Sequence, residues 1–75
     1  MALDLLRTDQ LIDLVRAGGG LKINASIRKT ADLMSLAQAA SAKQVTVHFT
    51  GCSLKQPEDL LLIARAGAGC VVFED

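Results

Sequence analysis

TADLMSLAQAASAKQVTVHFTGCSL, residues 30–54, is the stretch from which the fold can be read. In its first half the apolar residues Leu33, Leu36 and Ala37 recur with helical spacing, which indicates one buried helix face. In its second half apolar and polar residues alternate over 45–50, as expected for a strand buried on one side. The stretch therefore predicts a helix, a tight connection, a strand and a loop.

The helical half of this stretch has two imperfect copies, TDQLIDLVRAG at residues 8–18 and PEDLLLIARAG at residues 57–67. The copies begin twenty-two residues before and twenty-seven residues after Thr30, and self-similarity at this spacing is typical of repeat architectures. Chance similarity among three amphipathic helices is the alternative interpretation. We expect one αβ-repeat domain over residues 1–75, with repeats at approximately 8–29, 30–56 and 57–75.

Local signals mark the ends of these elements. Thr8 is a candidate N-cap, and glycines 18–20 are suited to ending the first helix because glycine adopts the left-handed conformation of a C-cap. Pro57 suits the first position of the third helix, where its missing N–H is not needed. Further strands are expected at 21–25 and 70–73, and the register of the last one stays open.

Connections this short between helix and strand require parallel neighbouring strands and right-handed crossovers. We therefore predict an α/β fold, a short right-handed solenoid of about two and a half αβ repeats. Its parallel sheet is in sequential order and all helices lie on one face. The alternating strands leave the other face open, whereas a doubly wound sheet would favour apolar strands throughout.

The open strand face is the first candidate binding surface. Its expected contact residues are Lys22, Asn24, Thr46, His48 and Thr50. None is aromatic or arginine, the residue types that dominate interface energetics, so binding through this face alone should be weak.

The segment VHFTGCSL, residues 47–54, resembles the leucine-rich repeat consensus, with Val47, Phe49, Cys52 and Leu54 at its key positions. The helix that follows it is similar to the helical half of the longer, ribonuclease-inhibitor-like repeats. Residues 21–27 are one residue short of the same pattern, and the last copy stops at its strand. The resemblance implies a concave binding surface made by the strands, with the position of Cys52 turned inward and bonded to backbone in the adjacent loop.

Composition excludes several classes of function. Eight basic residues balance eight acidic ones, which argues against a nucleic-acid-binding footprint. No apolar run approaches the ~20 residues that span a bilayer. Asp4 interrupts the apolar N-terminus, so we expect a cytoplasmic protein without a signal peptide, and Cys52 and Cys70 should be reduced and packed.

Few residues offer catalytic chemistry. His48 is the single histidine, Cys52 should face the core, and Cys70 lies one strand away. A cysteine–histidine pair would also need an orienting third group, and metal-ligand spacing is absent from the sequence. We expect no catalytic residues, no metal, no cofactor and no enzymatic activity.

A cluster of basic residues precedes the helix N-termini, where the carboxyl ends of the parallel strands gather. Its members are Arg7, Arg28, Lys29 and Lys55. In open α/β sheets this rim is the usual ligand side, so it is a candidate site for an anion such as phosphate. Acidic residues in the first helical turns would neutralise much of its field.

The sequence thus favours a non-enzymatic protein-interaction or scaffolding module whose partner is a protein. The alternatives are a self-assembling structural unit, a fragment of a longer repeat array, or a small anion- or phosphate-binding domain that uses the basic rim. We expect self-association or a protein partner, and neither nucleic acid nor membrane.

Overall fold

The computed structural model describes residues 6–75, and within them it shows three α-helices and a three-stranded parallel sheet. The helices are α1 (Thr8–Arg16), α2 (Thr30–Lys43) and α3 (Pro57–Gly67). The strands are β1 (Leu21–Asn24), β2 (Val47–Thr50) and β3 (Val71–Phe73). Short 3-10 helices, η2 (Ala25–Ile27) and η3 (Cys52–Leu54), follow the first two strands. Asp4, on which the expected location partly rests, lies outside the described residues.

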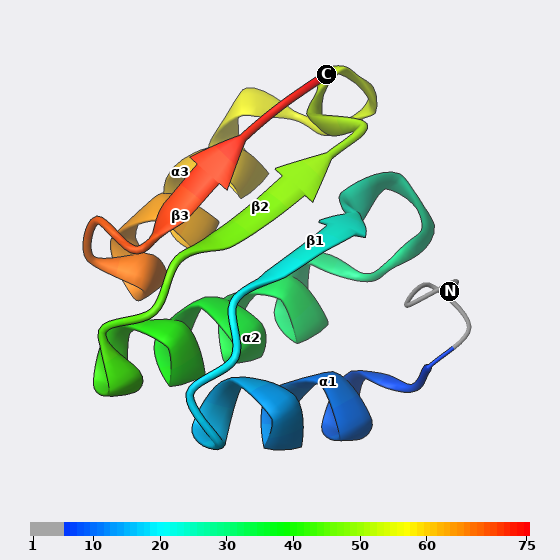
Figure 1. Ribbon diagram of the computed structural model, residues 1–75. Helices are drawn as coiled ribbons and strands as arrows, with labels where there is room; N and C mark the ends of the chain where they lie inside the picture. The colour runs from blue at the N-terminus through cyan, green and yellow to red at the C-terminus, as the bar shows by residue number, and fades with distance from the viewer. Residues whose placement is uncertain (1–5) are drawn as a thin grey trace.

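The strands pair in the order β1-β2-β3, all parallel, which confirms the predicted sheet in sequence order. Figure 1 shows the three helices on one face of this sheet and the other face bare. α2 lies between α1 and α3 and packs against both. In the register, Ile23 stands beside Phe49 and Phe49 beside Phe73, so the inward-facing residues of the strands form continuous rows.

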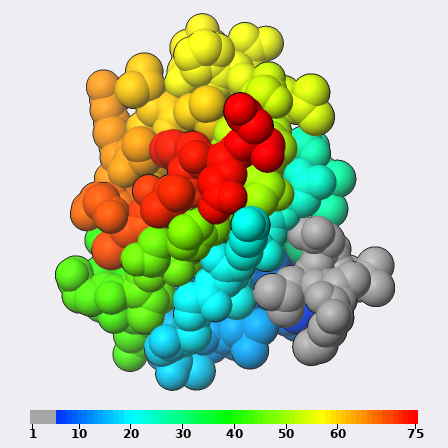
Figure 2. Space-filling model, turned by 45° about the horizontal axis from the view of Figure 1, so that its top comes forward, coloured from blue at the N-terminus to red at the C-terminus, as the bar shows by residue number. Residues whose placement is uncertain are grey.

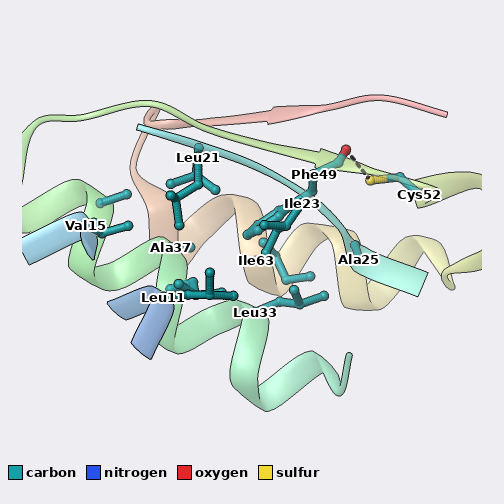
Figure 3. Packing of buried hydrophobic residues seen from close by; sticks show 13 residues of the cluster. Leu11, Val15, Leu21, Ile23, Ala25, Leu33, Ala37, Phe49, Cys52 and Ile63 are labelled. Carbon is teal, nitrogen blue, oxygen red and sulfur yellow. Dashed lines mark hydrogen bonds between the residues drawn. The ribbon is translucent and has the colours of Figure 1, made fainter. Parts of the chain in front are cut away.

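The hydrophobic core fills the space between the sheet and the helix layer (Figure 3). Phe49 on the central strand is fully buried and lies 6.4 Å, centroid to centroid, from the ring of Phe73. The other buried apolar residues come from all three helices, from β1 and β2, and from the two 3-10 helices: Leu11, Val15, Leu21, Ile23, Ala25, Leu33, Leu36, Ala37, Ala40, Val47, Cys52 and Ile63. Alanine is common where α2 meets its neighbours, because a central helix must approach elements on three sides.

The structure decides which side chains of the last strand face the core, a point that the sequence left open. Val71 and Phe73 face the core and are half-buried, and Val72 faces the bare side with 39% of its surface exposed. β3 is an edge strand of the sheet formed by the described residues, so one flank of Val71 and of Phe73 has no neighbouring strand there.

Two local predictions about the first helix were wrong. The N-cap residue is Arg7, and Thr8 is the first helical residue. Leu14, which the copy at residues 8–18 aligns with Leu36 and so places on the buried face, is 41% exposed, because α1 lies at the end of the helix layer and α2 is its only neighbour among the described helices. The prediction that a glycine in the left-handed conformation ends the first helix was confirmed, because Gly18 has φ of +98° just past the helix end.

Candidate functional site

The bare face of the sheet presents one row of side chains across all three strands. Lys22 on β1 is in register with His48 on β2, and His48 is in register with Val72 on β3. Because side chains alternate along a strand, these three point away from the core. The row is therefore exposed by the same alternation that buries Ile23 and Phe49.

Glu74, which directly follows β3, contacts residues of both β2 and β1. Its backbone N–H donates to the carbonyl of Phe49 at 2.7 Å, which extends the pairing of the last strand. Its carboxylate accepts a hydrogen bond from His48 Nδ1 at 2.7 Å and forms an ion pair with Lys22 Nζ at 3.2 Å. Since an ionised carboxylate can only accept, His48 carries its proton on Nδ1, and Nε2 is then the acceptor of the neutral ring. We call Lys22, His48 and Glu74 the cross-strand cluster.

This cluster borders a shallow, open depression on the bare face. Figure 2 shows this part of the surface, where the C-terminal residues lie beside β2 and β1. The lining residues are Gly20, Leu21, Lys22, Thr46, His48 and Glu74. Three predicted contact residues, Lys22, Thr46 and His48, are thus brought together. Sequence reasoning missed Glu74, although the alternation from Val72 to position 74 would have placed it on the same face.

The other two predicted contact residues are held by the protein itself. The Asn24 side-chain oxygen accepts from the Ser26 backbone N–H at 2.9 Å and from the Ser26 hydroxyl at 2.6 Å, which caps η2. Thr50 donates its hydroxyl to the carbonyl of Ile23 at 3.2 Å. Both side chains secure the carboxyl end of the sheet, and neither lines the depression.

In the predicted basic rim, Arg28 connects separate parts of the chain. Its Nη1 donates to the hydroxyl of Thr8 at 3.2 Å, and its Nη2 donates to the carbonyl of Leu6 at 2.8 Å. Lys55 Nζ in turn donates to the carbonyl of Arg28 at 2.6 Å. These contacts tie the segment before α1 to the loops that precede α2 and α3.

The remaining rim residues are separate from this group. Arg7 pairs with Asp9 within the first turn of α1, at 3.3 Å and with both side chains mostly exposed. Lys29 is the exposed N-cap residue of α2. Three of the four rim cations are therefore engaged with the protein's own oxygens.

Cys52 and His48 lie on opposite sides of the sheet. Cys52 is buried, its Sγ donates to the carbonyl of Phe49 at 3.1 Å, and burial raises the pKa of its thiol above the ordinary value (Figure 3). A buried thiol with a raised pKa is a poor nucleophile. Within residues 6–75 no three His, Cys, Asp or Glu side chains gather as metal ligands.

The cross-strand cluster should make the stability of the protein depend on pH in the acid range. The hydrogen bond from His48, followed by that from Lys22, holds the pKa of Glu74 below its ordinary value of 4.5. A carboxyl with a lowered folded-state pKa stabilises the fold above its unfolded pKa, and that contribution is lost as pH falls through the folded pKa. We therefore expect Glu74→Gln to lower the melting temperature at pH 6–7, and the difference from wild type to shrink on acidification below about pH 4.5.

This experiment is thermal denaturation followed by circular dichroism over a pH series. Asp13→Asn is the control, because this carboxylate is exposed on α1, in the helix layer, and is not part of the cross-strand cluster. If the difference in melting temperature between the wild type and Glu74→Gln stayed constant with pH, this would contradict the ion pairing of Glu74.

Comparison with protein families, with curated proteins and with solved structures finds no match for this chain. In the described part of the chain no helix is both long and apolar enough to cross a membrane.

Proposed function

We propose that this protein is a non-enzymatic interaction module, a short right-handed α/β solenoid that binds a protein partner on the bare face of its sheet. The observation that carries the proposal is the cross-strand cluster. Lys22, His48 and Glu74 meet on a sheet face that none of the described helices covers, beside an open depression.

The solenoid interpretation is supported by equivalent positions in the sheet. Leu21, Val47 and Val71 stand side by side, and η2 and η3 follow their strands in the same way. The longer second copy carries one extra residue, Gly51, with φ of +70°, at a place where a Cβ would lie 2.7 Å from the side-chain oxygen of Asn24.

The leucine-rich-repeat resemblance stays a prediction. Of its four key positions, Val47, Phe49 and Cys52 are buried, and Leu54 is 77% exposed. Cys52 turns inward, but its thiol bonds to the carbonyl of Phe49 within its own turn.

The chemistry of the face indicates the kind of partner. Lys22 offers ammonium donors, His48 Nε2 is directed away from the carboxylate that holds Nδ1, and Val72 adds an exposed apolar patch beside them. A partner segment with a carboxylate for Lys22, a donor for His48 and a small apolar side chain for Val72 would match this row. Without an aromatic or arginine anchor, we expect a dissociation constant of about 1 μM or weaker.

The test is partner capture by the wild type and by a Lys22→Ala/His48→Ala variant. We expect a partner retained by the wild type to bind the double variant at least about tenfold more weakly, because its polar contacts are lost. Gln38→Ala, on the exposed side of α2, is the matched control and should retain the partner. Equal retention by all three proteins would exclude the bare sheet face as the binding surface.

A further inference from the structure

The outward side of α3 carries an exposed apolar stripe with a charge at each end. Leu61 and Leu62 are 57% and 43% exposed, and Glu58 and Arg65 beside them are exposed as well. At 100° per residue these four side chains fall within an arc of about 100°. The centre of the arc lies about 150° around the helix from Ile63, which is fully buried. We call these four residues the α3 stripe.

The other helices do not present such a stripe. In α2 the residues at the equivalent positions of the two leucines are Met34, which is half-buried, and Ser35. In α1 they are Ile12, which is half-buried, and Asp13. Two adjacent exposed leucines on the outside of a helix are therefore a feature of α3 alone among the described helices, and they are not needed for packing against α2 or the sheet.

The charges at the two ends of the stripe have no side-chain partner among residues 6–75. Neither Glu58 nor Arg65 forms an ion pair or a side-chain hydrogen bond with another residue of the described chain. They stand seven residues apart, two turns along the helix, so they do not reach each other as neighbours three or four residues apart would. Both charges are thus available to a surface that packs on the leucines.

We propose that the α3 stripe is a self-association surface, on which α3 of a second copy packs antiparallel about a two-fold axis. An axis passing between Leu61 and Leu62 sets position 58 opposite position 65, since each is three and a half residues from the midpoint. Glu58 then faces Arg65 of the second copy, Arg65 faces Glu58 of the second copy, and the leucines meet at the centre. A self-complementary patch of this kind is what a two-fold interface requires.

The charge order selects this arrangement over others. A parallel second helix would place Glu58 beside Glu58 of the second copy and Arg65 beside Arg65, which is repulsive at both ends. The antiparallel arrangement pairs opposite charges and also opposes the two helix dipoles. A second copy of this chain supplies a helix with the reversed charge order automatically, whereas a foreign helix would need it by coincidence.

Self-association through α3 is compatible with the proposed binding function. The helix layer lies on the opposite side of the sheet from the cross-strand cluster (Figure 1), so a dimer leaves the bare face of each copy free. Such a dimer would offer a partner two equivalent sheet faces, which raises avidity without any new contact at either face. Because a single helix pair buries little area, the dimer should be weak, with a dissociation constant on the order of 10 μM to 1 mM.

The test uses charge reversal at the two ends of the stripe. By sedimentation over about 10 μM to 1 mM, the wild type should show concentration-dependent dimerisation. Glu58→Arg alone and Arg65→Glu alone each place like charges opposite one another, and each should weaken the dimer by about tenfold or more. An equimolar mixture of the two variants should dimerise again, because each end contact of the mixed dimer joins an arginine to a glutamate, one pair with the native polarity and one with the polarity reversed.

Hydrophobic variants give a second measurement. Leu61→Ser should weaken the dimer, and Ile27→Ser, at a similarly exposed apolar residue (60%) on η2, should leave it unchanged. Circular dichroism establishes that each variant is folded. A wild type that stays monomeric at the highest concentration overturns the proposal, and a helix of a different protein is then the remaining candidate occupant of the α3 stripe. A wild-type dimer whose variants and their mixture all associate equally also overturns it, and assigns association to another surface such as the free edge of β3.

Discussion

Replacement of Phe49 by alanine should lower the free energy of unfolding by about 3–5 kcal/mol, the largest effect expected of any single truncation in this chain. Phe49 is fully buried at the centre of the middle strand, and its ring lies against that of Phe73 and between the helices and the sheet. The truncation removes apolar contacts from all of these elements and leaves a cavity that a small core cannot fill. For a chain of 75 residues the total stability is about 4–11 kcal/mol, so this single truncation should remove at least about a quarter of it.

Urea denaturation followed by far-ultraviolet circular dichroism measures this loss. Val72→Ala on the adjacent strand is the control, because Val72 faces the bare side and its truncation should cost less than about 1 kcal/mol. If the two variants were equally stable, the alternation that buries position 49 and exposes position 72 would be wrong.

Replacement of Gly67 by alanine should destabilise the protein by about 1–3 kcal/mol, although the same change in an exposed helix interior is favourable by about 0.8–1.0 kcal/mol. The reason is tertiary: a Cβ at position 67 would clash with Val71 Cγ2 and lie 3.2 Å from Val71 Cβ, where the last turn of α3 packs against the start of β3. One of these groups must move, and Ala37 closes the same space at 3.5 Å.

A double-mutant cycle with Val71→Ala tests this explanation. Val71→Ala removes the Cγ2 atom that clashes, so the double variant should be less destabilised than the sum of the two single variants. Urea denaturation of the four proteins gives the coupling free energy. Additive losses, or a single Gly67→Ala variant more stable than the wild type, would contradict the close packing of α3 on β3.

The elements of this protein were predictable because their signals are local. Helical spacing, a proline at the start of α3 and strand alternation each depend on residues within about ten positions of one another, and each was confirmed. The parallel order of the strands followed from the shortness of the connections. The exposure of Leu14 was not predictable, because helical spacing identifies the apolar face of a helix but not how far neighbouring elements cover that face.

The candidate site was predictable only in part. Lys22 and His48 were placed on the bare face by alternation, and the structure brings them within reach of one carboxylate. Glu74 was missed because the register of the last strand decides which side of the sheet it reaches. Asn24 and Thr50 were placed in the right region, but the structure directs their polar atoms to Ser26 and to the carbonyl of Ile23.

The amino-acid sequence by itself determined the order of helices and strands, the parallel sheet and the alternation that leaves one sheet face bare, since these follow from spacing along the chain. Only the tertiary structure decided that residues as distant in sequence as Lys22 and Glu74 form an ion pair, that Arg28 ties α1 to the loops, and that Gly67 has no room for a side chain. Such contacts depend on the register and packing distance between elements, and no short-range pattern specifies either quantity.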